Sequence, residues 1–63
     1  MVYKVAMFDG KIIHTEPAEN PRLSDGTYNV AELVEFFHRV KRSHKIAYDN
    51  SKVVQYSARY ADQ

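Results

Sequence analysis

The sequence predicts a small α+β domain in which one helix packs on one face of an antiparallel sheet, with the elements in the order ββαββ. Three observations carry this prediction: a helical period of apolar residues over 29–44, an Asp-Gly turn between two β-prone segments near the start, and alternating apolar and polar residues near the end. The chain has 63 residues, which is the size of one domain. We therefore treat residues 1–63 as a single unit.

The first expected element is a β-hairpin over residues 2–16. Asp9-Gly10 is a strong turn signal, because a two-residue type I′ turn needs positive φ at both central positions. The expected pairs are Phe8–Lys11, Met7–Ile12, Ala6–Ile13, Val5–His14, Lys4–Thr15 and Tyr3–Glu16. In this register neither face of the hairpin is purely polar, although a half-buried strand should alternate more sharply. Either the second face meets a partner, or the register differs.

Residues 17–28 are expected to connect the hairpin to the helix. Pro17 ends the second strand because it cannot donate to a sheet, and Asp25-Gly26 marks another tight turn. Leu23 is the only large aliphatic residue of this segment, so we expect it to hold the segment against the core. A connection of this length can carry a function, but a plain crossover is the interpretation that we favour.

The helix is expected to run from Asn29 to His44. Asn29 is a good N-cap residue, and Glu32 stands where its carboxylate can reach back to the cap amide, as in a capping box. Spacings of three and four residues place five apolar residues on one stripe that should face the sheet: Val30, Leu33, Val34, Phe37 and Val40. Phe36 lies about 100° from the centre of that stripe. It is therefore either a flank of the core or an exposed anchor for a partner.

Residues 45–63 are expected to form two further strands joined by a turn at Asp49-Asn50. The β-branched and tyrosine content of this segment favours strand. The alternative is a helix that begins near Asn50 or Ser51. The two interpretations differ in the side chains that they turn toward the core.

Composition excludes several classes of protein. The chain has no cysteine, which excludes disulfides and thiolate zinc sites. It has no apolar run near the roughly 20 residues needed to span a bilayer, and its start does not resemble a signal peptide. We therefore expect a cytoplasmic protein without a membrane partner. The charge is divided, since residues 1–35 carry three Lys/Arg against six Asp/Glu and residues 36–63 carry six against two.

Neither catalysis nor metal binding is expected. The sequence has no nucleophile motif, no P-loop and no Cys nucleophile, so we predict a protein that is not an enzyme and uses no cofactor. His38 and His44 are six residues apart, which puts them about 120° apart around a helix and prevents both from binding one metal from the same face. A site that combines His14 with one helix histidine and a carboxylate has no further support.

A basic cluster at the end of the helix suggests one possible function, nucleic-acid binding. Its candidate residues are Arg39, Lys41, Arg42 and Lys45. They could contact phosphates, and tyrosines of nearby strands could stack on single-stranded bases. A solvated helix end whose cations offset the dipole explains the cluster equally well. The pI near 8.0 is lower than that of strongly basic nucleic-acid-binding domains. We keep this function as the alternative.

The leading hypothesis is a small protein that binds another protein, as an inhibitor or adaptor, and that can also form a homo-oligomer. The chain offers more apolar and aromatic surface than one helix can cover, and Tyr and Arg are residues that interfaces favour. The interface candidates are Phe36, Phe8, Ile13, Tyr56 and Tyr60. Compact domains with divided charge are common among accessory proteins of phages and mobile elements, so by this association we expect a viral protein.

Overall fold

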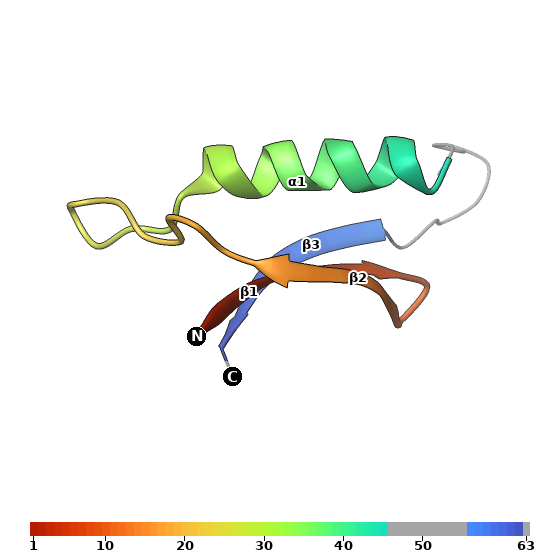
Figure 1. Ribbon diagram of the computed structural model, residues 1–63, viewed down its shortest axis with the longest axis horizontal. Helices are drawn as coiled ribbons and strands as arrows, with labels where there is room; N and C mark the ends of the chain where they lie inside the picture. The colour runs from red at the N-terminus through yellow and green to blue at the C-terminus, as the bar shows by residue number, and fades with distance from the viewer. Residues whose placement is uncertain (46–55, 63) are drawn as a thin grey trace.

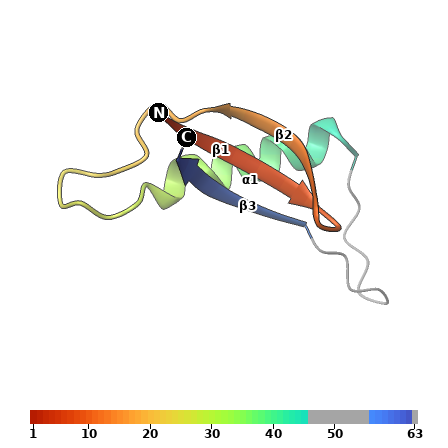
Figure 2. The ribbon, with the colours of Figure 1, turned by 90° about the horizontal axis from the view of Figure 1, so that it is seen from below.

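The computed structural model describes residues 1–45 and 56–62, which form two layers: a three-stranded antiparallel sheet and one helix on one of its faces (Figure 1). The elements are β1 (Val2–Phe8), β2 (Lys11–Pro17), α1 (Val30–Ser43) and β3 (Tyr56–Asp62). The strands lie in the order β2-β1-β3, so the first strand is central (Figure 2). The α+β class and the antiparallel sheet are confirmed. The expected order ββαββ is not matched, because the described residues are arranged ββαβ.

The strand near the end of the chain is confirmed over its described part. β3 pairs with β1 through seven consecutive residues, from Val2 opposite Asp62 to Phe8 opposite Tyr56. The helical alternative is therefore wrong for residues 56–62. The expected turn at Asp49-Asn50 lies outside the described residues.

The turn of the first hairpin forms as predicted, but the register changes after two pairs. Asp9 and Gly10 have φ of 54° and 79°, the positive values that the two-residue turn requires. Phe8–Lys11 and Met7–Ile12 pair as expected, and the next pair is Ala6–His14. Ile13 is thus the extra residue of a β-bulge. The remaining pairs are each displaced by one residue: Val5–Thr15, Lys4–Glu16 and Tyr3–Pro17.

The bulge decides which side chains lie under the helix. Successive side chains of a strand point to opposite faces, so a displacement of one residue moves His14 and Glu16 to the face of Lys4 and Ala6. The expected register placed Thr15 opposite Lys4 and turned Glu16 to the other face. In the structure the Lys4 ammonium is buried and lies 3.2 Å from the Glu16 carboxylate. A buried charge needs such a partner, which favours the bulged register.

The helix presents a different face to the sheet from the one predicted. Phe36 is fully buried and packs on Ala6 and Ala58, whereas Val30 and Val34 are 64% and 46% exposed. The two alanines leave room between the layers for a phenyl ring, and the helix turns its largest apolar side chain into that space. Of the expected stripe, Leu33 and Val40 are confirmed as core residues and Phe37 is half-buried against Tyr56, whereas Val30 and Val34 are wrong. The core lies along Leu33, Phe36 and Val40.

The helix begins at the predicted cap but without the predicted capping box. The side chain of Asn29 accepts the Glu32 N–H at 3.2 Å. The Glu32 carboxylate does not return to the cap amide, which donates to the carbonyl of Pro21 instead. That carboxylate accepts the N–H groups of Glu19 and Asn20, at 2.8 and 3.1 Å. It therefore ties the incoming loop to the first turn of the helix.

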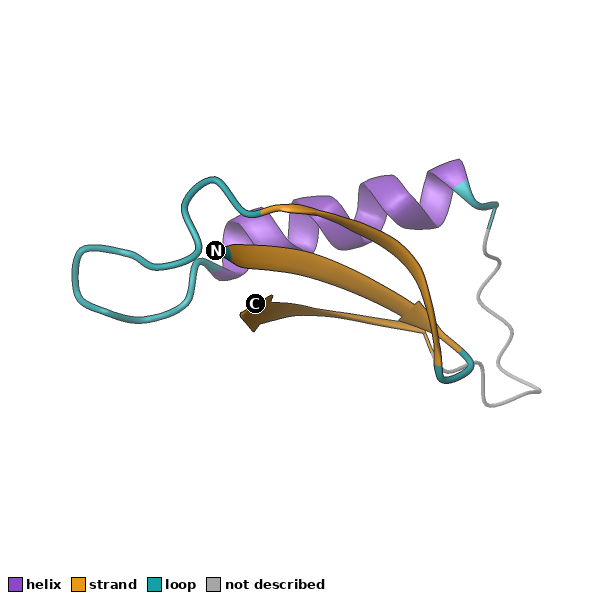
Figure 3. Cartoon of the chain, turned by 60° about the horizontal axis from the view of Figure 1, so that its bottom comes forward, coloured by secondary structure: helices purple, strands orange, loops and turns teal. Residues whose placement is uncertain are grey.

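The loop between β2 and α1 projects beyond the end of the sheet (Figure 3). Leu23 is 49% exposed, so the expected contact of this residue with the core is wrong. The loop is held by its own contacts: the Arg22 guanidinium lies over the ring of Tyr28 at 4.4 Å and donates to the carbonyl of Gly26. These contacts, together with the Arg22–Tyr28 bridge of the backbone, order the loop without an apolar anchor.

Candidate functional site

The side of the sheet away from α1 carries a surface that no other described element covers. We call this surface the open face. Lys4 and Ala6 point toward the helix, so the alternate residues of β1 (Tyr3, Val5 and Met7) point away from it, as do their partners in register. The open face consists of Tyr3, Val5, Met7, Ile12, Thr15, Pro17, Ser57, Arg59 and Ala61.

The centre of the open face is apolar. Tyr3, Val5 and Met7 follow one another along β1, the central strand, and Ile12 lies directly opposite Met7. Ile12 is 61% exposed, and Tyr3 and Met7 are half-buried. Val5, which lies between Tyr3 and Met7 on this face, is buried. The result is a continuous row of aromatic, branched and thioether side chains.

Arg59 gives the open face a positive charge. It lies opposite Val5 in the register of β1 and β3, and it is exposed. No carboxylate pairs with it among the described residues, and none of the nine side chains of the open face is acidic. A ligand for this face would therefore combine an apolar surface with an acceptor or an anion.

The predicted interface residues lie elsewhere. Phe36 is fully buried in the core, so its role as an exposed anchor is wrong, and Ile13 packs against that core. Phe8 is half-buried, on the side of β1 that faces the helix. Tyr56 and Tyr60 donate their hydroxyls to carbonyls of the helix and of its N-cap residue. None of the five belongs to the open face.

The two tyrosines fasten β3 to the helix. The hydroxyl of Tyr56 donates to the carbonyl of Phe37, and that of Tyr60 donates to the carbonyl of Asn29, both at 2.7 Å. Tyr60 also stacks on Tyr28, with ring centroids 5.5 Å apart. Burial raises the pKa of both Tyr56 and Tyr60, which keeps the hydroxyls protonated as donors. These rings are part of the scaffold.

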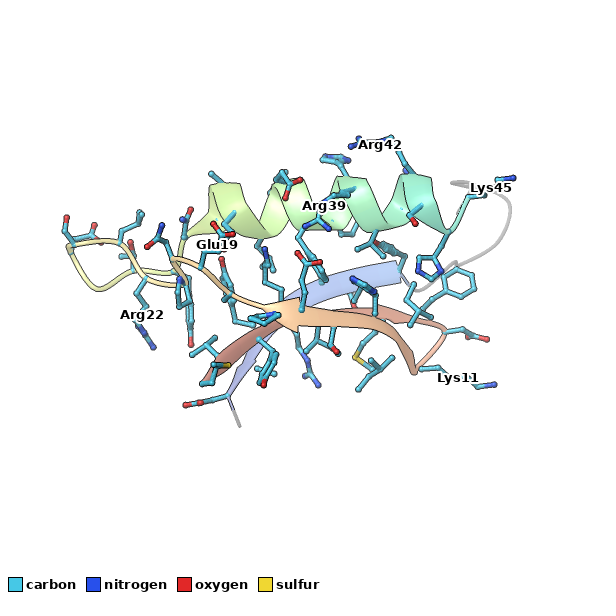
Figure 4. The ribbon with its side chains drawn as sticks, in the orientation of Figure 1. Lys11, Glu19, Arg22, Arg39, Arg42 and Lys45 are labelled. Atoms are coloured by element: carbon cyan, nitrogen blue, oxygen red, sulfur yellow. The ribbon has the colours of Figure 1, made fainter. Side chains whose placement is uncertain are left out.

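The structure does not bring the basic candidates together. Arg39 points toward the sheet, whereas Arg42 points away from it and Lys45 lies beyond the end of the helix (Figure 4). The guanidinium of Arg39 donates to Glu16 and Glu35, at 3.0 Å each. These hydrogen bonds raise the pKa of Arg39 further above its usual value. Arg39 therefore serves the joint between the helix and β2.

An ionic network joins the two layers beside Phe36. The Lys4 ammonium lies 3.2 Å from Glu16 and 3.5 Å from Glu32, with its side chain only 6% exposed. Hydrogen bonds from Arg39, helped by His14 and Lys4, outweigh burial and lower the pKa of Glu16 from 4.5 to about 2. A carboxylate held in its charged form by three partners is suited to fixing the helix on the sheet. It is poorly suited to act as a general acid, which must carry a proton near neutral pH.

Two of the three histidines meet at the C-terminal end of the helix. The rings of His14 and His44 are 6.3 Å apart between centroids, and they line a cavity of about 230 Å³ with Arg39, Val40 and Ser43. Nε2 of His14 lies 3.1 Å from the Glu16 carboxylate. Within the part of the chain that the structure describes, no group of three His, Asp or Glu side chains is arranged to hold a metal ion.

Sequence reasoning missed the residues of the open face. Its signal was present, because the hairpin showed apolar side chains on both faces in any register. The expected register already placed Tyr3, Val5, Met7 and Ile12 on one face of the hairpin, but the pattern did not decide which face the helix covers.

Comparisons with protein-family models, with curated proteins and with solved structures found no match for this chain. In residues 1–45 and 56–62, no helix is both long enough and apolar enough to cross a membrane.

Proposed function

We propose that this chain is a small, non-enzymatic binding protein, of the inhibitor or adaptor type, that holds another protein against its open face. One observation carries the proposal: the single helix covers one face of the sheet, and the opposite face exposes Ile12 beside the half-buried Tyr3 and Met7, which lie on either side of the buried Val5. An antiparallel sheet can leave one face in water, but such a face is normally polar. An uncovered apolar row is typical of an interaction surface.

The charge of the open face indicates the chemistry of the partner. Arg59 stands beside the apolar row without an acidic neighbour on that face. A partner carboxylate placed opposite Arg59 would form a charge-assisted hydrogen bond while the apolar groups around it exclude water. Tyr, Met and Arg are also the residue types that interface cores favour. The expected partner surface is therefore apolar with an acidic side chain at its centre.

The rest of the fold supports this role by making the face rigid. The Lys4–Glu16–Arg39 network, the Phe36 core and the two tyrosine hydrogen bonds all lie on the other side of the sheet. They hold the three strands in place before any partner binds. A preorganised surface loses less conformational entropy on binding, which favours affinity.

The test uses proteins captured from source cells by the tagged chain. Each captured protein is purified and titrated by calorimetry against the wild type, Ile12→Asp and Arg59→Glu. Leu23→Asp is the control, because Leu23 is also an exposed aliphatic residue but lies on the projecting loop. We expect the two face variants to weaken binding by roughly tenfold or more, as for an interface anchor. Equal affinities for all four proteins would overturn the proposal.

The alternative function, nucleic-acid binding at the end of α1, has a direct test of its own. Labelled single-stranded DNA and RNA are titrated with the wild type and with an Arg42→Glu, Lys45→Glu double variant. Both residues are exposed; Arg42 points away from the sheet, and Lys45 lies beyond the end of the helix (Figure 4). Tight binding that weakens steeply with salt and is lost in the double variant would establish this alternative. We expect no such binding.

A further inference from the structure

Two histidines from different elements meet beside the C-terminal end of α1. His44 caps the helix, and His14 lies on β2, where it pairs with Ala6 and so belongs to the face of the sheet that the helix covers. The two rings are 6.3 Å apart between centroids, and both line a cavity of about 230 Å³. Imidazole is the commonest metal ligand in proteins, so two imidazoles at one cavity are a candidate metal site.

The ring of His14 is held in one orientation and one tautomer. It stacks on Phe36 with centroids 6.0 Å apart, and its Nε2 lies 3.1 Å from the Glu16 carboxylate. Glu16 is charged at neutral pH, because hydrogen bonds from Arg39, His14 and Lys4 lower its pKa to about 2. A charged carboxylate only accepts hydrogen bonds, so Nε2 of the neutral ring carries the proton. The lone pair of His14 is therefore on Nδ1.

Nδ1 of His14 is turned away from Glu16, toward the end of the helix. β2 runs antiparallel to α1, so along the helix Glu16 lies nearer the start than His14 does, and His44 lies beyond it on the other side (Figure 1). The two nitrogens of an imidazole lie on different edges of the ring, and Nε2 already faces Glu16. Among the described residues, neither Nδ1 of His14 nor the ring of His44 has a hydrogen-bond partner.

The charges around the cavity suit a cation better than an anion. Arg39 lines the cavity, but its guanidinium donates to the carboxylates of both Glu16 and Glu35. One positive charge thus stands between two negative ones, and the donors of Arg39 are directed at these carboxylates. The C-terminal end of a helix also carries a partial negative charge, which favours a cation and repels an anion.

From this juxtaposition we propose that His14 and His44 bind one divalent transition-metal ion of the Zn²⁺ type, through Nδ1 of His14 and a ring nitrogen of His44. Imidazole suits Zn²⁺, Ni²⁺ and Cu²⁺, whereas Mg²⁺ and Ca²⁺ prefer oxygen ligands. Glu16 holds His14 from behind, as carboxylates hold many histidines that bind zinc. The site lies on the helix side of the sheet, so it goes beyond the proposed function of the open face and does not depend on it.

The distance between the two rings fits this ion after a small movement of His44. A Zn–N bond of about 2.0–2.1 Å places the metal about 3.2 Å from the centroid of each ligand ring. Tetrahedral coordination then needs centroids about 5.2 Å apart, which is about 1 Å less than the 6.3 Å of the structure. His44 is exposed at the end of the helix, so rotation of its side chain can close this difference.

The site differs from a structural zinc site because it has two protein ligands instead of four. No third His, Asp or Glu of the described residues completes it, so water fills the remaining positions. The proposal departs from the expectation of the sequence, in which His14, a helix histidine and a carboxylate had no reason to meet. In the structure they do meet, and the carboxylate orients His14 rather than binding the ion. A bound ion would tie β2 to the end of the helix.

The test titrates Zn²⁺ into the untagged chain by calorimetry near neutral pH, because ligating imidazoles must be unprotonated. The variants are His14→Gln, His44→Gln and, as the matched control, His38→Gln. His38 is an exposed histidine of the same helix that does not line the cavity. The wild type and His38→Gln should bind one Zn²⁺ per chain. His14→Gln and His44→Gln should bind at least about tenfold more weakly, and Mg²⁺ should not bind.

Two further measurements separate ligation from an effect on folding. Nitrogen NMR of the wild type should show Zn²⁺ shifting Nδ1 of His14 and one ring nitrogen of His44, while Nε2 of His14 keeps its proton and His38 is unchanged. The urea midpoint should rise with Zn²⁺ concentration in the wild type and His38→Gln but not in His44→Gln. Far-UV circular dichroism confirms that each variant is folded.

Three outcomes would overturn the proposal. The first is equal Zn²⁺ affinity for all four proteins, and the second is a loss of binding in His38→Gln. The third is a doubling of the mass in sedimentation when Zn²⁺ is added, because His44 would then bind an ion between two chains and not together with His14.

Discussion

Lys4 is the residue on which the joint between sheet and helix depends. It lies on the central strand under the helix, where its ammonium meets Glu16 and Glu32 and lies 5.4 Å from the centre of the Phe36 ring. Burying a charge is unfavourable unless it is paired and hydrogen-bonded, so Lys4 fixes where its two carboxylates must lie. The position of the helix on the sheet follows from that requirement as well as from the packing of Phe36.

Glu16 makes the stability of the fold sensitive to acid. The pKa of Glu16 is about 2 in the folded chain, against an ordinary value of 4.5 that we take for the unfolded chain. Because the folded pKa is depressed, the contribution of this carboxylate is fully present above pH 4.5 and is lost as the pH falls toward 2. We expect the urea midpoint to fall over this window. Glu16→Gln should lower the midpoint at neutral pH and make the fall below pH 4.5 less steep.

The measurement is a set of urea titrations at several pH values, followed by circular dichroism. Thr15→Val is the control, since Thr15 is the exposed neighbour of Glu16 on the open face. It should keep the wild-type dependence on pH. If the urea midpoint of Glu16→Gln fell with decreasing pH as steeply as that of the wild type, the Lys4–Glu16–Arg39 contacts would not be what makes the fold sensitive to acid.

Side-chain burial along the helix could not be predicted from the sequence alone. Phe36 and Val34 are both apolar, and the 3.6-residue period allows either to lie near the centre of a stripe. The choice depends on the surface of the sheet, where Ala6 and Ala58 leave space for a ring. That space exists only after residues 52 positions apart in the chain have been brought side by side. Pattern analysis therefore located the helix but not its rotation about its axis.

At the scale of elements, the hairpin shows what local signals can and cannot specify. Asp9-Gly10 specified the turn and the first two pairs, because the turn residues adopt the required positive φ. The bulge at Ile13 had no local signal, since either register leaves apolar side chains on both faces. What distinguishes the registers is the partner for Lys4, which is a tertiary requirement. The open face was missed for the same reason.

Deletion of Ile13 should test this account of the bulge. Without the extra residue His14 directly follows Ile12, so a regular register keeps the pairs Ala6–His14 and Lys4–Glu16. The ion pairs of Lys4 are therefore retained, and the deletion removes the packing of Ile13 against the core. Loss of a partly buried aliphatic side chain costs up to about 3 kcal/mol, so we expect a folded protein with a lower urea midpoint.

Far-UV circular dichroism and urea unfolding measure the effect, with deletion of Ser24 as the matched control. Ser24 lies in the projecting loop, where one residue fewer leaves the strand register unchanged. The control should stay folded. An unfolded Ile13 deletion would contradict this account, because it would mean that the bulge itself, and not only the pairing of Lys4 with Glu16, is needed for the fold.

At the scale of the whole molecule, the polar contacts of Glu32 join every described part except β2. Its carboxylate accepts the amides of Glu19 and Asn20 from the loop, the hydroxyl of Tyr60 from β3 at 3.3 Å, and the ammonium of Lys4 from β1. Burial alone would raise the pKa of Glu32, but these amides and Lys4 outweigh burial and hold the pKa below its usual value. Glu32 remains charged, and through it the loop, the helix and the sheet are coupled.

Removal of this carboxylate should therefore loosen the projecting loop as well as weaken the fold. In Glu32→Ala the amides of the exposed residues Glu19 and Asn20 lose their acceptor to water, each at a cost of about 0.5–1.5 kcal/mol, the net contribution of an ordinary hydrogen bond. We expect faster amide hydrogen exchange over residues 19–28 and a lower urea midpoint. Glu35→Ala is the matched control, because Glu35 is a helix carboxylate that contacts Arg39 at the surface and none of the loop. It should leave exchange in the loop unchanged. If Glu32→Ala destabilised the chain while the loop amides exchanged as in the wild type, the loop would be held by the Arg22–Tyr28 contacts alone, and Glu32 would join only the helix and the sheet.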